Sequence, residues 1–473
     1  MFDFEFDDPL GNDRSDDLIE AYEAHLQDGT PAFFDADDLE YIATAYFETG
    51  RLAEALEVID RQIERSPGSS DPWMRRGILL NHLDRQEEAL AAYDEALALN
   101  PVDVETLVNR GITLDTIGRS DEALEDFERA LSFDPLASDA LFNQAIAFEK
   151  LDRFDEAASA LEACAEADPE HPEVWYELGF CYDQLDRLED SVEAYDRQID
   201  VDPYAQNAWY NRGIVLNRLG RYEEAVSSYD FAVAIDDGFT SAWYNRGNAL
   251  ANLGDAQGAA DSYLKVLEHE DGDAATFYNL GLAYDDLGDY AAAVDYFRRA
   301  VADDADYADA WYGMGCALDG QGLYNEALVA FARAIALAPE ESEYWHARAD
   351  TEYNAGRLAE ALEAYEQVVR IDASNKDAWL DLAETRLEAG LRTEALEAFS
   401  QVVRLDPTSS EAHLRQAWAL ASIGQRESAV RSFRRAAELD PSRAEEIRRA
   451  YPDLAGGDRT GGLGRGAAGD ERT

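Results

Sequence analysis

A period of 34 residues dominates this chain and recurs twelve times without a gap, from Ala36 to Arg443. The third unit shows the pattern of small, large and turn-forming residues: Leu107, Gly111, Leu114, Ala123, Phe127, Ala130 and Pro135. Adding 34 to most of these numbers gives an equivalent residue. Units of this length stack so that each contacts only its neighbours. The period therefore predicts a continuous array, not the separate globular domains that 473 residues would otherwise suggest.

Each unit has room for two helices. In the sixth unit, Trp209, Gly213 and Leu216 follow helical spacing, and Ala225 and Tyr229 continue it beyond the break at Gly220. The break, position 15 of the unit, is Gly in nine units and Asp in three: Asp84, Asp152 and Asp186. Gly adopts a left-handed backbone freely, and Asp tolerates it better than bulky residues do. We therefore expect an all-α chain of helix pairs.

Small and large side chains alternate at fixed positions of the unit. Position 8 is Gly or Ala throughout, position 20 is Ala except at Ser191, and position 24 is aromatic in ten units. Small residues let the two helices approach closely, and the rings fill the space that remains. This alternation predicts a core that runs through the whole array.

The fifth unit carries the most complete motif: Trp175, Leu178, Gly179, Tyr182, Tyr195 and Pro203. With it the chain resembles the tetratricopeptide-repeat family over residues 36–443. The resemblance implies a right-handed α-solenoid superhelix of antiparallel helix pairs, whose first helices line a concave groove. The family's closing Pro is missing from four units, at Asp237, Asp271, Ala305 and Ala373, where looser joints are expected.

The flanks differ from the array in composition. Residues 1–35 are acidic, and Ser15 to Gln27 is expected to form one helix that covers the exposed end of the first unit. Residues 442–453 are expected to form a C-terminal capping helix, because a solenoid needs a solvated end. Residues 454–473 are rich in Gly and are expected to be disordered.

The chain is strongly acidic, with 100 acids against 40 bases and a net charge of −60. Such a surface repels phosphates, so neither nucleic acid nor a membrane is an expected partner. There is no apolar run long enough for a membrane span, no secretory signal and no Cys pair, which predicts a cytoplasmic protein. The acidity could attract a basic partner or be an adaptation to concentrated salt, of a bacterial or archaeal type. Its even spread and the scarcity of Lys favour salt adaptation.

The family resemblance implies that positions 2, 5, 9, 12 and 13 face the groove. The candidate ligand-binding residues at these positions are Tyr176, Phe180, Tyr210, Asn217, Arg218, Tyr244, Asn248, Asn252, Tyr278, Asp285 and Tyr312. The five tyrosines occupy position 5 of consecutive units. Phenol rings offer contact area and amides can bond a peptide backbone, although consensus packing explains the same residues equally well. Acids at groove positions point to a neutral or basic peptide.

Arginine recurs at position 7, where the family more often has Leu: Arg76, Arg110, Arg212, Arg246 and Arg348. These side chains could reach a ligand carboxylate. We expect instead that they lie along the packed surface and pair with neighbouring acids, since an Arg stem is long and apolar.

Searches for catalytic and metal motifs give nothing specific. The six histidines are scattered, and the chain lacks a zinc motif, a phosphate-binding loop and a calcium loop. We therefore expect no catalytic residue, no metal and no cofactor. The leading hypothesis is a non-enzymatic scaffold, a monomer or weakly self-associating, that binds a protein or extended peptide in its groove. The alternative is a structural subunit that assembles through its convex face or ends.

Overall fold

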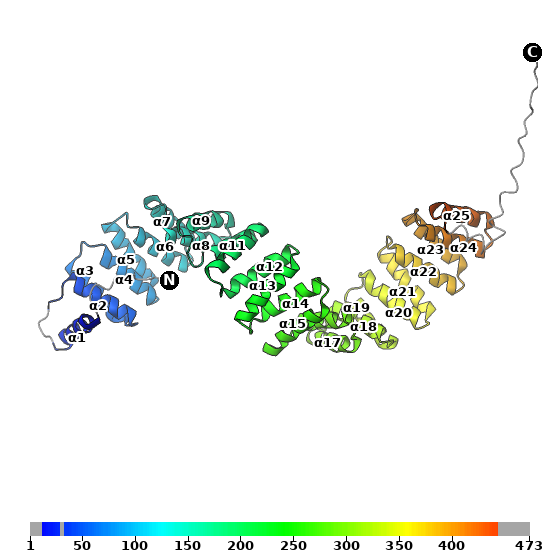
Figure 1. Ribbon diagram of the computed structural model, residues 1–473, viewed down its shortest axis with the longest axis horizontal. Coiled ribbons are helices and arrows are strands. Elements are labelled where there is room, and N and C mark those ends of the chain that lie inside the picture. The colour runs from blue at the N-terminus through cyan, green and yellow to red at the C-terminus, as the bar shows by residue number, and fades with distance from the viewer. Residues whose placement is uncertain (1–11, 29–32, 443–473) are drawn as a thin grey trace, which may run out of the picture. The chain divides into compact units, whose positions relative to one another are not determined.

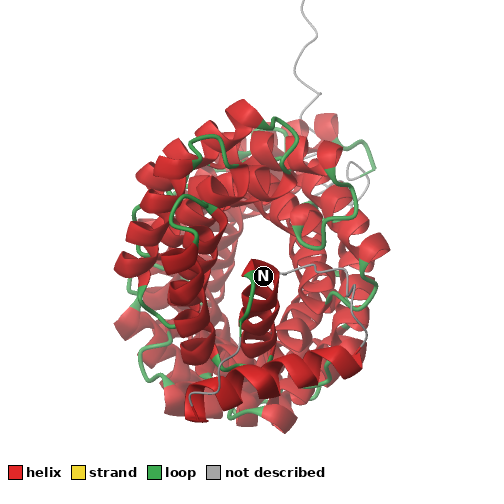
Figure 2. Cartoon of the chain, turned by 90° about the vertical axis from the view of Figure 1, so that its left-hand side faces the viewer, coloured by secondary structure: helices red, strands yellow, loops and turns green. Residues whose placement is uncertain are grey.

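The computed structural model describes residues 12–28 and 33–442, and within these residues every regular element is a helix (Figures 1 and 2). The predicted C-terminal capping helix (442–453) and the Gly-rich tail lie outside the described residues, apart from Ser442. The chain divides into two compact units, each of which contains several of the 34-residue repeats: the first unit covers residues 1–237 and the second unit covers residues 238–473. Each is a stack of antiparallel helix pairs, so the prediction of an all-α solenoid is confirmed.

The first unit holds thirteen described helices: α1 (Asn12–Asp28), α2 (Ala36–Glu48), α3 (Leu52–Arg65), α4 (Asp71–His82), α5 (Gln86–Leu99), α6 (Val104–Thr116), α7 (Ser120–Phe133), α8 (Ser138–Lys150), α9 (Phe154–Ala167), α10 (Val174–Gln184), α11 (Leu188–Val201), α12 (Gln206–Arg218) and α13 (Tyr222–Ile235). The second holds twelve: α14 (Thr240–Asn252), α15 (Ala256–His269), α16 (Ala274–Asp286), α17 (Tyr290–Asp303), α18 (Ala308–Gly320), α19 (Tyr324–Leu337), α20 (Ser342–Asn354), α21 (Leu358–Ile371), α22 (Lys376–Glu388), α23 (Arg392–Leu405), α24 (Ser410–Ser422) and α25 (Arg426–Leu439). From α2 onward, an even-numbered helix is the first helix of a repeat and the next odd-numbered helix is its second.

The turn inside each repeat has the left-handed backbone that its residue type predicts. All nine Gly residues at position 15 have φ between 71° and 81°, and Asp84, Asp152 and Asp186 have φ of 60°, 56° and 58°. The backbone N–H two residues past each first helix bonds back to a carbonyl of its last turn, as Gly118 does to Asp115 at 3.1 Å. This closure ends the first helix and starts the chain back antiparallel to it.

The core consists of position 20 packed among the rings of position 24. The Ala residues at position 20 are fully buried in all eleven repeats that have one. Ser191, the exception, is buried as well, and its hydroxyl donates to the carbonyl of Gly179 at 2.7 Å. The aromatic residues of position 24, such as Tyr229 and Phe297, are at most 3% exposed. The predicted continuous core is therefore present in each unit.

A tryptophan hydrogen bond fastens consecutive repeats. The indole N–H at position 4 donates to the carbonyl at position 32 of the preceding repeat, as Trp175 does to Pro169 at 3.0 Å. Where Pro is missing, at Ala305 and Ala373, Trp311 and Trp379 make the same bond at 3.0 and 3.1 Å. The bond is kept at these two places because it uses the backbone carbonyl and not the proline ring.

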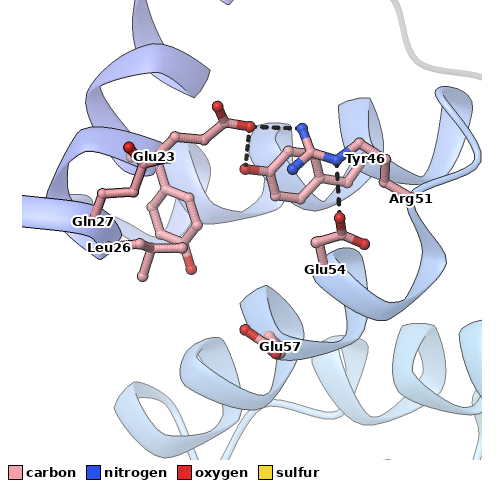
Figure 3. Close-up of a pocket in the computed structure, with 8 residues that line it drawn as sticks. Glu23, Leu26, Gln27, Tyr46, Arg51, Glu54 and Glu57 are labelled. Carbon is pink, nitrogen blue, oxygen red and sulfur yellow. Dashed lines mark hydrogen bonds and ion pairs between the residues drawn. The ribbon is translucent and has the colours of Figure 1, made fainter.

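The N-terminal helix α1 packs on the first repeat. It begins three residues before the predicted Ser15, and its Tyr22 is 2% exposed, with its ring 5.2 Å from that of Phe34. In Figure 3, Arg51 reaches the carboxylate of Glu23 at 2.6 Å, and the hydroxyl of Tyr46 donates to the same carboxylate at 3.3 Å. The small pocket between these elements holds about 200 Å³, and its Arg51 bonds to both Glu23 and Glu54. These contacts describe a cap.

The close approach of position 8 to position 24 can be tested by whether an added methyl group raises or lowers the free energy of unfolding. A Cβ on Gly213 would lie 2.5 Å from a ring carbon of Tyr229. Ala favours a helix over Gly by about 1 kcal/mol, yet we expect Gly213→Ala to destabilise the protein by about 1–3 kcal/mol because the ring must move. Urea unfolding measures this. A more stable variant would contradict the packing scheme, and Ala349→Gly, in a repeat built for Ala, serves as the reciprocal control.

Candidate functional site

The five tyrosines of position 5 pack, half-buried, against the core of their own repeats. Each ring lies beside the aromatic ring at position 24, with centroid distances of 5.9 Å for Tyr176, 6.1 Å for Tyr210, 5.7 Å for Tyr244, 5.9 Å for Tyr278 and 6.0 Å for Tyr312. Edge and tilted contacts at these distances stabilise aromatic pairs. The tyrosines therefore contribute to packing, and only part of each ring is accessible to a ligand.

Amide side chains join position 5 to the next repeat. Asn211 donates to the hydroxyl of Tyr176 at 3.0 Å, and Asn279 donates to that of Tyr244 at 2.9 Å. The carbonyl oxygen of Asn248 accepts from the hydroxyl of Tyr263 at 2.8 Å. These bonds pair residues that are 35 or 15 positions apart in the sequence. They fix the phenols of Tyr176 and Tyr244 in place within their own units.

The structure adds two tyrosines that position 5 alone does not reveal. The rings of Tyr278 and Tyr307 lie 4.9 Å apart, and those of Tyr312 and Tyr344 stack at the same distance. Tyr344 donates its hydroxyl to Asp309 at 2.5 Å. Both added residues sit at the joint between repeats, outside the five positions that the family pattern indicates. In the second unit the aromatic row is therefore wider than the sequence predicts.

The remaining candidates differ in how far their polar atoms are already occupied. Arg218 is ion-paired with Asp183 and, at 2.7 Å, with Asp186. Phe180 sits edge-on to Phe154 at 6.0 Å, and exposed Asn252 donates to a backbone carbonyl of its own helix. The carbonyl oxygen of Asn217 and one carboxylate oxygen of Asp285 are buried without a protein partner.

Acids cluster where the fourth and fifth repeats meet. The burial of Glu177 raises the pKa of its carboxyl to about 7, and the charges of Glu149 and Glu173 act in the same direction. Burial likewise raises the pKa of Glu149, whose carboxylate accepts from the thiol of Cys181 at 3.2 Å. Cys181 itself is buried, and burial raises its pKa, which keeps it protonated. This surface carries less negative charge at neutral pH than the sequence suggests.

Three of the five arginines of position 7, Arg76, Arg110 and Arg212, pair with acids along the packed surface, as predicted. Arg110 bonds to Asp126 through two nitrogens at 2.6 and 2.7 Å and reaches Asp94 of the preceding repeat at 2.5 Å. Arg212 bonds in the same way to Asp196 and to the hydroxyl of Ser228. The pattern makes these arginines clamps between second helices, so they are not candidates for holding a ligand.

A cluster of one histidine and two aspartates matches no standard sequence motif. His346 and Asp350, on α20, lie beside Asp381 of α22, and the imidazole Nε2 is 3.0 Å from an oxygen of Asp381 and 3.8 Å from one of Asp350. The hydrogen bond that the imidazole donates to the carboxylate of Asp381 raises the pKa of His346. In the sequence, this cluster is visible only as His346 and Asp350 four residues apart, with Asp381 a further 35 residues after His346. No standard motif encodes that spacing.

Stacked helix pairs with conserved turn, core and joint positions define an α-helical repeat protein. Profiles described as tetratricopeptide repeat match residues 42–104, 108–172, 142–205, 182–239 and 380–444, and further profiles of that description match 240–268, 286–350 and 353–396. These matches span most of the array. The chain therefore belongs to the tetratricopeptide-repeat family.

Several solved structures are similar to parts of this chain. YrrB, described as a TPR protein with an unusual peptide-binding site, is 24% identical with a TM-score of 0.36, over 40% of this chain and 96% of that one. A tetratricopeptide repeat protein from Parabacteroides merdae is 16% identical with a TM-score of 0.38, over 52% and 98%. A chain of the APC/C hetero-tetramer Cut9–Hcn1 is 16% identical with a TM-score of 0.39, over 87% of this chain and 97% of that one. The comparison with curated proteins found no match.

Members of this family mediate protein–protein interactions and are typically not enzymes. Within residues 12–28 and 33–442, no helix is both long enough and apolar enough to cross a membrane.

The acidic cluster around Glu177 predicts a pH-dependent stability. Its folded pKa of about 7 lies above the usual 4.5, so the folded state holds the proton more tightly. The stability that this carboxyl contributes is therefore lost as pH rises from about 4.5 to about 7. We expect Glu177→Gln to be more stable than the parent by about 1 kcal/mol at pH 8 and to match it near pH 4.5. Thermal melts across this range, with exposed Glu193→Gln as control, measure the difference; equal gains at both pH values would contradict it.

Proposed function

We propose that this protein is a non-enzymatic scaffold that binds a protein or an extended peptide along the face formed by its first helices. Family membership supports a protein partner in general. The observation that carries the finer proposal is the set of half-buried tyrosines at position 5, two of which are hydrogen-bonded to an amide of the next repeat. A rigid aromatic surface binds with little loss of side-chain entropy.

The second unit offers the better-developed surface. Tyr278 and Tyr312 present ring area there, and Leu282, one helical turn after Tyr278 on α16, is 39% exposed. Asp285 lies one helical turn beyond Leu282, with a carboxylate oxygen that has no protein partner. Apolar contacts next to acids suit a peptide that alternates apolar and basic or neutral residues.

In the first unit, the corresponding surface comprises Tyr176, Phe180, Tyr210 and Asn217. The exposed Arg218 does not make this surface basic, because Arg218 is ion-paired with two acids of the same unit, Asp183 and Asp186. This surface would also favour a neutral or basic ligand.

Assembly through the outer face is the second candidate. Val329 is 65% exposed on the second helix α19. Apolar residues also recur in the loops that close repeats of the first unit, where Val102, Leu136 and Tyr204 are 56%, 72% and 78% exposed. Exposed apolar side chains in register along a stack can dock against another subunit.

A matched pair of substitutions separates the two candidates. Leu282→Arg places a cation on the first-helix face, and Val329→Arg places the same cation on a second helix. We expect Leu282→Arg to weaken binding of a fluorescent peptide of alternating lysine and leucine by about tenfold, or ~1.4 kcal/mol, and Val329→Arg to change it less than twofold. Fluorescence anisotropy measures both affinities.

The same two variants, used as bait for partner capture, decide between the faces. Loss of partners with Leu282→Arg alone supports the first-helix face, whereas loss with Val329→Arg alone overturns the proposal in favour of assembly. Circular dichroism confirms that each bait is folded.

The charge surplus gives a further expectation. We propose that the acidity is a salt adaptation, because the acids are spread through all repeats. Screening of self-repulsion should then raise the melting temperature as salt increases from about 0.1 to about 1 M, where the Debye length falls from ~10 to ~3 Å. A melting temperature that falls or stays constant over this range would remove that explanation.

A further inference from the structure

We propose that His346, Asp350 and Asp381 form a binding site for a divalent transition-metal ion of the zinc class. The three side chains come from adjacent repeats of the second unit and offer one imidazole nitrogen and two carboxylate oxygens. Their ligand atoms all lie within 4.8 Å of one another. This site goes beyond the proposed peptide-binding function and does not depend on it.

The distances suit such an ion. Bonds of about 2.0–2.2 Å at tetrahedral angles place neighbouring ligand atoms ~3.3–3.6 Å apart. The observed separations from the imidazole Nε2, 3.0 Å to Asp381 and 3.8 Å to Asp350, lie on either side of that range. His346 and Asp381 are 26% and 39% exposed and Asp350 is 53% exposed, so an ion can reach the cluster from solvent and Asp381 has room to rotate onto it.

The donor set selects the kind of ion. Imidazole nitrogen is a good ligand for zinc, cobalt and nickel, whereas magnesium and calcium prefer six or more oxygens. With three protein ligands, the ion would keep at least one position for water or for a group of a partner.

The surroundings of the cluster support a cation. The hydroxyl of Tyr365, itself 3% exposed, donates to a carboxylate oxygen of Asp350 at 2.5 Å and fixes the orientation of that side chain. The charges of Asp319 and Asp377 also act on the cluster. Such outer contacts are what hold metal ligands in position.

The same three positions in an earlier pair of repeats show what an ordinary joint contains. There Tyr244, Asn248 and Asn279 take the places of His346, Asp350 and Asp381, and the two amides and the phenol bond to one another. The ring at position 5 lies 5.7 Å from the position-24 ring in both cases. A joint between two repeats therefore packs well with Tyr and Asn at these positions. Packing alone does not explain why the joint between α20 and α22 has His and two Asp residues.

This equivalence supplies a fold-preserving control. The triple variant His346→Tyr, Asp350→Asn, Asp381→Asn rebuilds the ordinary joint and removes all three ligands. In about 1 M salt, where diffuse attraction to the acidic surface is screened, Co²⁺ is titrated into the full chain. Visible absorption reports ordered coordination, and calorimetry with Zn²⁺ gives the affinity. Mg²⁺ in excess tests for hard-ion competition.

We expect saturable Co²⁺ and Zn²⁺ binding by the parent protein, and a loss of at least about tenfold in affinity in the triple variant. Tyr365→Phe, which keeps the ring and removes the outer hydrogen bond, should weaken binding about tenfold. Absence of saturable binding by the parent overturns the proposal. So does a folded triple variant with unchanged affinity and spectrum, because binding would then belong to the other histidines.

Discussion

The contact between a glycine and an aromatic ring sets the geometry of the seven repeats that have Gly at position 8. Where position 8 is Gly, the ring of position 24 lies so close that a Cβ would come within about 2.4–2.8 Å of it. That approach brings the two helices together over a fully buried Ala at position 20. The interior is close-packed, so no neighbouring side chain can take up the misfit. Tyr229 against Gly213 is one instance, and Phe331 against Gly315 is another.

The position-5 tyrosines inherit their placement from that core. Because Tyr244 packs on Tyr263 and Tyr278 packs on Phe297, one side of each phenol is buried. The same tyrosine can therefore pack against the core with one side of its ring and contact a ligand with the other. A role in packing, which is common at this position of the family, does not exclude a role in binding. A ring that is already fixed costs little to bind, which makes the first-helix face a natural place for recognition.

Charge is arranged more locally than a net value of −60 suggests. Arg110 and Arg212 neutralise acids between second helices, whereas Glu177 and Glu149 are partly buried on first helices and have raised pKa values. His346 shares its acids with a neighbouring repeat. The joints between first helices therefore differ in charge from repeat to repeat, and they are where specificity can differ as well.

The sequence by itself determined the helix pairs, the left-handed turns and the buried positions, because these depend on residue type at a fixed period. It also predicted correctly that Arg110 would pair with acids. Only the tertiary structure decided which side chains meet across a joint, such as Asn279 with Tyr244 and His346 with Asp381. Those partners are 35 residues apart. The angle between stacked repeats brings them together, and no local pattern in the chain encodes that angle.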